Sequence, residues 1–96
     1  MKIFLLDDER ESITQIEAFI TEYAEKMGVS MQAHGFTDPE IFLKEYDKSD
    51  QKPYLVILPV EMKKMSGIEV AHTLREKGSS VRLILMDVSD KYAMDA

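Results

Sequence analysis

The sequence predicts an α/β fold built on a parallel sheet, and two observations lead to this prediction. The first is a series of short apolar runs that have the length of strands. The second is that segments between these runs carry apolar residues at every third or fourth position, which is the spacing of a helix. Strands that alternate with helices pair in parallel through right-handed crossovers. The 96 residues suffice for one small domain, residues 1–96.

The first element is a strand, followed by a long helix. "KIFLLDD" at 2–8 is an apolar run stopped by acids, which predicts a buried strand. From Glu9 the spacing becomes helical, and Gly28 is a suitable place for this helix to end. Its predicted apolar stripe consists of Ile13, Ile16, Phe19, Ile20, Tyr23 and Met27.

A weaker strand is predicted at 30–36, "SMQAHGF", before a second helix. Thr37 with Glu40 three residues later has the pattern of a capping box, and Pro39 suits a first helical turn because its missing N–H is not needed there. The side chains of this helix expected to face inward are Ile41, Phe42 and Tyr46.

The second half of the chain repeats the alternation. "YLVIL" at 54–58 is the most hydrophobic run and predicts the central strand. Ser66 and Gly67 open a third helix that ends near Gly78, with Ile68, Ala71 and Leu74 expected to face inward. A fourth strand is predicted at 81–86 and the first turns of a fourth helix at 89–96.

Charge and composition exclude several classes of function. A net charge of −6 argues against direct nucleic-acid binding, which needs a surplus of Lys and Arg. The chain has no cysteine, so disulfides and thiol chemistry are excluded, as is usual in a reducing cytoplasm. No apolar run approaches the roughly 20 residues of a membrane span, and no signal peptide precedes the first strand. We therefore expect a cytoplasmic protein with no membrane contact.

Four acidic residues follow the predicted strands. In parallel sheets the functional crevice lies at the carboxyl ends of the strands. The loops there contain Asp7, Asp8, Glu61 and Asp87, whereas the residue at the end of the third strand is Pro59, which has no reactive group.

Three stretches carry a resemblance to a known family: "FLLDDE", "YLVILPVEMKKMSGIEVAHTLREKG" and "VRLILMDVSDKYAMDA". Together, over the whole chain and in order, they resemble the receiver domain of two-component response regulators. The "DKYAMDA" ending is most similar to LytTR-type regulators. The resemblance implies a flavodoxin-like, three-layer α/β/α fold with strand order 2-1-3-4. The fold would be truncated to about four strands, because the family's fifth strand and helix would follow Ala96.

The resemblance also assigns roles to the acids. Receiver domains accept a phosphoryl group on an aspartate at the end of the third strand. They hold Mg²⁺ with this aspartate, with the acid pair after the first strand, and with a backbone carbonyl two residues past the acceptor. Here Asp7 and Asp8 match the acid pair and Glu61 matches the carbonyl position. The acceptor position holds Pro59, which cannot form an acyl phosphate.

Two further positions depart from the family's pattern. Asp87 stands where a Ser or Thr contacts the phosphoryl group, and Lys63 stands where proline is usual. Asp87 is either a fixed negative charge that imitates phosphorylation or, in the interpretation we favour, a residue that has drifted. Asp7 and Asp8 are either a retained, weak Mg²⁺ site or inherited acids at a solvated strand end, and both interpretations stay open.

The predicted function is that of a pseudo-receiver, or a receiver fragment, in two-component signal transduction. It would act without Asp phosphorylation, through contact with a signalling protein or an effector domain, and would not be an enzyme. An apolar fourth strand at the edge of the sheet also predicts a homo-oligomer. The alternative is a metal-dependent hydrolase that uses the carboxylate rim. The sequence disfavours this alternative because it offers no nucleophile, no histidine base near the rim and no Gly-rich phosphate loop.

Overall fold

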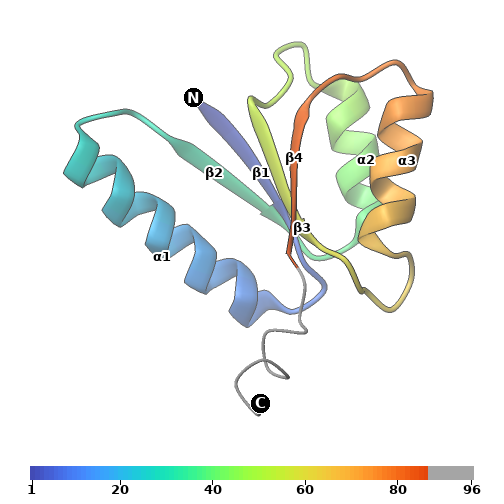
Figure 1. Ribbon diagram of the computed structural model, residues 1–96, viewed down its shortest axis with the longest axis horizontal. Coiled ribbons are helices and arrows are strands. Elements are labelled where there is room, and N and C mark those ends of the chain that lie inside the picture. Colours follow the sequence, from blue (N-terminus) through green and yellow to red (C-terminus); the bar gives the residue numbers. More distant parts are fainter. Residues whose placement is uncertain (87–96) are drawn as a thin grey trace.

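A computed structural model describes residues 1–86, which form four strands and three helices (Figure 1). In chain order they are β1 (Lys2–Leu6), α1 (Arg10–Met27), β2 (Gln32–Phe36), α2 (Pro39–Lys48), β3 (Leu55–Pro59), α3 (Gly67–Glu76) and β4 (Arg82–Met86). Asp87 and the helix predicted at 89–96 lie outside the described residues. No helix within residues 1–86 has the length and apolar character needed to cross a membrane.

The four strands form one parallel sheet in the order β2-β1-β3-β4, which confirms the prediction. β1 lies inside the sheet and pairs with both β2 and β3, so that Ile3 is opposite Ala33 on one side and Leu55 on the other. Four of its five residues are buried, because both faces of the sheet carry helices at this strand.

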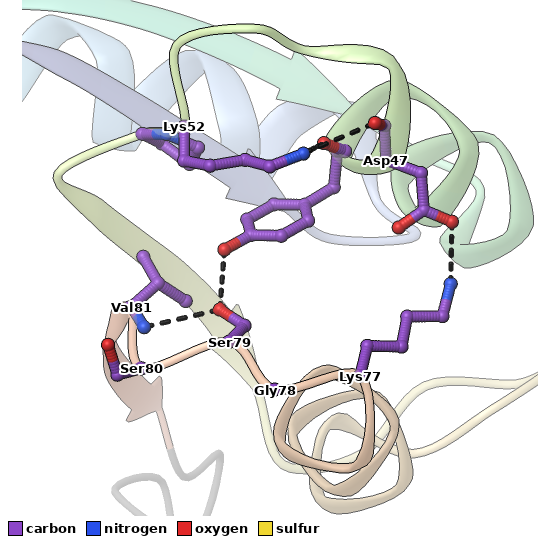
Figure 2. A pocket seen from close by; sticks show the side chains of 9 residues that line it. Asp47, Lys52, Lys77, Gly78, Ser79, Ser80 and Val81 are labelled. Atoms are coloured by element: carbon purple, nitrogen blue, oxygen red, sulfur yellow. Dashed lines mark hydrogen bonds and ion pairs between the residues drawn. The ribbon is translucent and has the colours of Figure 1, made fainter.

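Hydrogen bonds at the helix ends explain where the helices start and stop. Asp38, not the predicted Thr37, caps α2: its Oδ1 accepts the backbone N–H of Glu40 at 2.9 Å. Thr37 was the wrong choice because a carboxylate one residue nearer the helix reaches the free N–H groups of the first turn. At the other end of α2, the Lys52 ammonium donates to the carbonyl oxygen of Asp47 at 3.2 Å (Figure 2).

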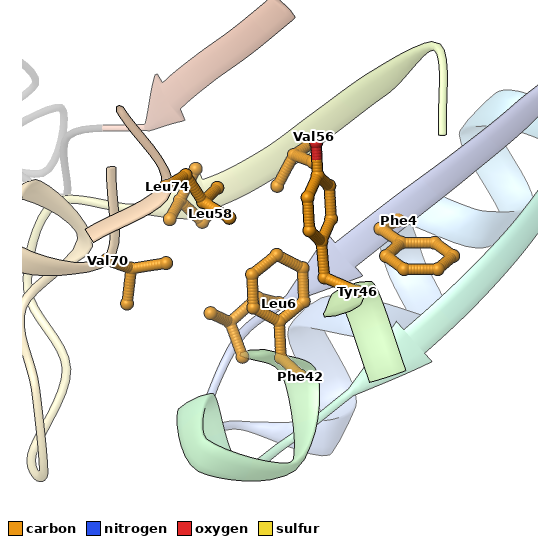
Figure 3. Close-up of a cluster of buried hydrophobic side chains, with 8 residues drawn as sticks. All are labelled: Phe4, Leu6, Phe42, Tyr46, Val56, Leu58, Val70 and Leu74. Atoms are coloured by element: carbon orange, nitrogen blue, oxygen red, sulfur yellow. The ribbon is translucent and has the colours of Figure 1, made fainter. Parts of the chain in front are cut away.

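The larger core lies between the sheet and the pair α2 and α3. Phe4 is at its centre, with its ring centroid 5.0 Å from that of Phe36 and 6.0 Å from that of Phe42, in the tilted and edge-on arrangements that aromatic rings prefer. Figure 3 shows its buried side chains, which are Phe4, Leu6, Phe42, Tyr46, Val56, Leu58, Val70 and Leu74.

The smaller core lies on the other face of the sheet, under α1. It contains Ile3, Leu5, Ile13 and Ile20. α1 packs on β1 and β2, and a glycine on β2 allows the close approach. A Cβ atom at Gly35 would lie 2.5 Å from Cγ2 of Ile13, so the smallest residue makes room for the helix.

For two residues of the shorter helices, the prediction that the side chain faces inward is wrong. Ile41 is 53% exposed and Ile68 is 58% exposed. Each lies next to the buried row rather than in it: Phe42 and Tyr46 are buried on α2, and Val70 with Leu74 on α3. One residue rotates a helix by about 100°, so a neighbour of a buried position points away from the sheet.

The predicted stripe of α1 is only partly buried. Ile13 and Ile20 are buried, whereas Phe19 is 70%, Tyr23 47% and Met27 59% exposed. α1 covers only the half of the sheet formed by β1 and β2 (Figure 1). The apolar stripe is therefore wider than its contact with the sheet, and the part that carries Phe19 and Tyr23 lies outside that contact.

Candidate functional site

The candidate site is the end of the sheet formed by the carboxyl ends of the strands, where three loops meet. In this subsection and the next two, "edge" refers to this carboxyl end. The loops are residues 7–9 after β1, residues 37–38 after β2 and residues 60–66 after β3. Residues 60–66 are called the β3–α3 loop below. Parallel strands bring their carboxyl ends to one edge, so residues more than 50 positions apart in the chain become neighbours here.

Asp7 is a buried acid directly after β1. It is only 8% exposed; its backbone N–H donates to the carbonyl oxygen of Phe36 at 3.0 Å, and its Oδ1 accepts the N–H of Glu9 at 2.9 Å. Burial raises the pKa of the Asp7 carboxyl and the negative charge of Asp8 adds to this, while the hydrogen bond from Glu9 acts in the opposite direction. Asp7 is therefore an acid whose charge the fold disfavours.

Asp8 is half-buried and contacts a loop far away in the sequence. Its Oδ2 accepts the backbone N–H of Lys63 at 2.9 Å, a hydrogen bond between residues 55 positions apart. A proline at this position would have no N–H to donate. Because position 63 is not a proline, its N–H can tie the β3–α3 loop to the end of β1.

A second contact ties the same loop to the start of α2. The Lys64 ammonium lies 2.8 Å from Oδ2 of Asp38. The hydrogen bond from Lys64, followed by the one from the Glu40 N–H, lowers the pKa of the Asp38 carboxyl, and the bond to Asp38 raises the pKa of Lys64. Asp38 therefore combines two roles, as helix cap and as anchor for the loop.

Pro59 is the buried last residue of β3, opposite Met86 of β4. The next residue, Val60, takes up the backbone bonding: its N–H donates to Met86 O at 2.8 Å, and its carbonyl accepts the N–H of Gly67, also at 2.8 Å. A proline is tolerated at the end of a strand because it interrupts the ladder there by one bond at most.

The structure brings some of the predicted site residues together. Asp7, Asp8 and the β3–α3 loop lie at the same end of the sheet. Glu61, whose backbone carbonyl was the predicted ligand, belongs to this loop, and its side chain is exposed to solvent. Asp87 lies outside the described residues. Sequence reasoning missed the hydrogen bond from Lys63 to Asp8. The signal available to find it was the absence of proline at a position where the resemblance leads one to expect it.

The donor set does not fit a firmly held divalent cation. Mg²⁺ requires near-octahedral oxygen coordination. Within residues 1–86, no group of three or more His, Cys, Asp or Glu side chains is placed to hold a metal ion. Asp7 and Asp8 each commit one carboxylate oxygen to a backbone N–H, and Pro59 offers no carboxylate where the family's third acid would be.

A separate cleft lies near the start of β3 and β4, and it was not predicted from the sequence (Figure 2). It is an open cleft of about 480 Å³. The Tyr46 hydroxyl lies 2.5 Å from Oγ of Ser79, and the Lys77 ammonium lies 2.6 Å from Oδ2 of Asp47. The Lys52 ammonium binds the Tyr46 and Asp47 carbonyls. These polar groups bond to one another and so form a junction between α2 and the turn before β4.

Comparisons with known proteins agree on the fold. No protein-family model matches the chain, and no curated protein matches it. Among solved structures, a two-component transcriptional regulator AraC from Clostridium phytofermentans ISDg is 24% identical with a TM-score of 0.75; the match covers 100% of this chain and 74% of that one. The MaeR response regulator bound to beryllium trifluoride is 20% identical with a TM-score of 0.70, over 92% and 67% of the two chains.

FixJ-N is 19% identical with a TM-score of 0.70, over 90% of this chain and 62% of its own. A further match, a fusion with the yeast Spc42 trimeric coiled coil, has a TM-score of 0.76, and the chain spans 54% of it. The chain thus spans about half to three quarters of the length of these structures. The described residues have the flavodoxin-like fold of response-regulator receiver domains.

Proposed function

We propose that the chain is a pseudo-receiver, or a receiver fragment, in two-component signal transduction, and that it works by protein–protein contact without Asp phosphorylation. The receiver-like fold supports the signalling role. One observation carries the rest of the proposal: Pro59 is the residue at the end of β3. It has no carboxylate, so it cannot take a phosphoryl group.

The neighbouring acids do not replace the missing acceptor. Asp8 accepts a hydrogen bond from Lys63, and Asp7 is buried with one oxygen bonded to the Glu9 N–H. Glu61 is exposed on the loop two residues past Pro59, which puts its carboxylate out of line with the end of the strand. In this proposal any Mg²⁺ binding at Asp7, Asp8 and the carbonyl of Glu61 is weak.

The proposed partner is a protein in the cytoplasm: a signalling protein, or an effector domain of the LytTR type that would link the chain to transcription regulation. The proposal includes a homo-oligomer formed through β4. Ile84 is 48% and Leu85 is 41% exposed, although both are large apolar residues. Arg82 is the one charged residue of this strand, so β4 has little to discourage pairing with another chain.

No observation favours the hydrolase alternative. Among the described residues neither histidine belongs to the loops that carry Asp7 and Asp8: His34 is within β2, and His72 is on α3 with its Nε2 2.9 Å from Glu76. Neither is placed as a base for a water molecule at the acid pair. We therefore do not propose an enzymatic activity.

The test is phosphorylation by a small phosphodonor. The protein is incubated with acetyl phosphate and Mg²⁺, and its intact mass is measured. We expect no mass change. The control is Pro59→Asp, which restores the carboxylate; it should label only poorly because the rest of the family's phosphoryl-binding groups are not restored. Stoichiometric labelling of the unmodified chain, mapped to residues 7–9 or 60–66, would contradict the proposal.

A further inference from the structure

The hydrogen bond between Asp8 and Lys63 has a consequence for the whole edge. It joins a carboxylate to a neutral backbone N–H at 2.9 Å, and such charge-assisted bonds are stronger than bonds between neutral groups. The donor belongs to the main chain, so it cannot move away as a side chain can. The bond breaks only when the Asp8 side chain rotates or the β3–α3 loop moves.

The loop is held on both sides of this bond. Met62 and Met65, which flank the two lysines, pack against the core cluster under α2 and α3. Lys64 is bonded to Asp38 at 2.8 Å. Moving Lys63 away from Asp8 therefore also disturbs the packing of Met62, which adds to the free energy needed to open the loop.

The loop also brings donors to the end of the sheet where the acids lie. Two carboxylates stand next to each other at positions 7 and 8, and positive groups from a single loop approach this edge of the sheet: the N–H dipole of Lys63 and the ammonium of Lys64. In a receiver-like fold this is the place where a cation would be expected to offset the acids. Here the chain supplies donors of its own.

We propose that the backbone N–H of Lys63 takes the place of a divalent cation at Oδ2 of Asp8, so that a cation can bind this oxygen only in competition with the β3–α3 loop. Oδ2 of Asp8 then has two alternative partners, the N–H of the loop or an ion. This deepens the proposed function, because it describes how the same site is held, but it does not depend on whether Pro59 prevents phosphorylation.

A pair of variants isolates the N–H. Lys63→Pro removes the side-chain charge and the N–H, whereas Lys63→Ala removes the charge and keeps the N–H. Mg²⁺ is titrated into each variant and followed by the amide chemical shifts of residues 7–9. A hydrogen bond to a charged group has a net strength that corresponds to about a tenfold change in an equilibrium constant or more. We expect the proline variant to bind Mg²⁺ about tenfold tighter than the alanine variant. Equal affinities, including no measurable binding by either, would overturn the proposal.

Hydrogen exchange of the unmodified chain gives an independent reading should the proline variant fail to fold. We expect the Lys63 amide to exchange slowly in metal-free protein and to lose this protection in Asp8→Ala. A Lys63 amide that is unprotected in metal-free protein, or that stays protected while Mg²⁺ saturates Asp8, would refute the idea. The phosphodonor assay does not involve this amide, so failure of one proposal leaves the other standing.

Discussion

The carbonyl oxygen of Pro59 occupies the space where Gly67 would carry a side chain. A Cβ atom built at Gly67 overlaps this oxygen and lies 3.2 Å from Cδ2 of Leu85. The same glycine donates its N–H to Val60 O at 2.8 Å. The first turn of α3 is thus pressed against the end of β3, and the position of the β3–α3 loop depends on a residue without a side chain.

Gly67→Ala should therefore destabilise the protein. The added methyl group meets main-chain atoms, which cannot rotate away as a side chain does, so we expect a loss of about 1–3 kcal/mol in the free energy of unfolding. Urea denaturation followed by circular dichroism measures it. The matched variant is Gly28→Ala at the end of α1, where φ is 67° and no atom lies within 4 Å of the new methyl group.

At Gly28 only the left-handed backbone conformation is strained, which costs about 1 kcal/mol. A smaller loss at position 67 than at position 28 would show that α3 shifts easily and that the close approach to Pro59 is unimportant.

The junction between α2 and the turn before β4 predicts a coupling between two hydroxyl groups. Tyr46 is only 4% exposed and its hydroxyl lies 2.5 Å from Oγ of Ser79. Tyr46→Phe should lower the free energy of unfolding by about 0.5–1.5 kcal/mol, the usual net contribution of one hydrogen bond. Ser79→Ala should cost more, because this Oγ also accepts the N–H of Val81 at 3.2 Å.

The double variant Tyr46→Phe, Ser79→Ala completes the cycle. Strictly additive losses would mean that the two hydroxyl groups do not stabilise each other.

The buried carboxyl of Asp7 predicts a pH-dependent stability. Its pKa in the folded protein is raised above the ordinary value of 3.8, so the folded state holds the proton more tightly than the unfolded state. The contribution of Asp7 to stability therefore falls as pH rises from about 3.8 through the raised pKa, and stays low above it. Asp7→Asn, which has no charge to bury, should be more stable than the unmodified protein at about pH 7.

This advantage should disappear well below pH 3.8, where Asp7 is protonated in both states. Thermal melting across the pH range measures the difference. Asp50→Asn, at an exposed position, serves as the matched control. If Asp7→Asn is less stable than the unmodified protein at every pH, the fold needs the Asp7 charge.

If the chain associates with itself through β4, light scattering at micromolar concentration should give a mass above the 11.0 kDa of a single chain. Ile84→Lys places a charge on an exposed apolar residue of this strand. Because burial of an isoleucine is worth about 1.5–3 kcal/mol, the dissociation constant should rise about tenfold or more. Leu83 is a poor choice for this test because it packs against the core.

Gln32→Lys on β2, at the opposite edge of the sheet, is the matched variant. Equal weakening by both substitutions would point to another interface, and a monomer at all concentrations would remove β4 from the proposal.

Much of the fold could be predicted from the sequence because strands such as "FLL" and "LVIL" are apolar throughout and stopped by polar residues or proline. Burial within the helices was harder. Ile41 and Ile68 are as apolar as their buried neighbours, and only the position of each helix against the sheet decides which of them is covered. Asp38 and Thr37 are both good caps, and the backbone selects between them.

The candidate site was predictable in its location but not in its bonding. That Asp7 and Asp8 lie at the carboxyl edge follows from their place after a parallel strand. The bond from Lys63 to Asp8 joins residues 55 positions apart through a main-chain atom, and its one sign in the sequence is the absence of proline at position 63.

The place of β1 within the sheet also affects how the protein is made. Among the described strands β1 leaves the ribosome first, yet its two neighbours are β2, which begins at residue 32, and β3, which begins at residue 55. Translation at about 5–20 residues per second makes the nascent chain wait roughly 3–10 s between completing β1 and supplying β3. During this interval the apolar residues 3–6 have at most one strand beside them, so β1 reaches its buried position only after β3 has been made.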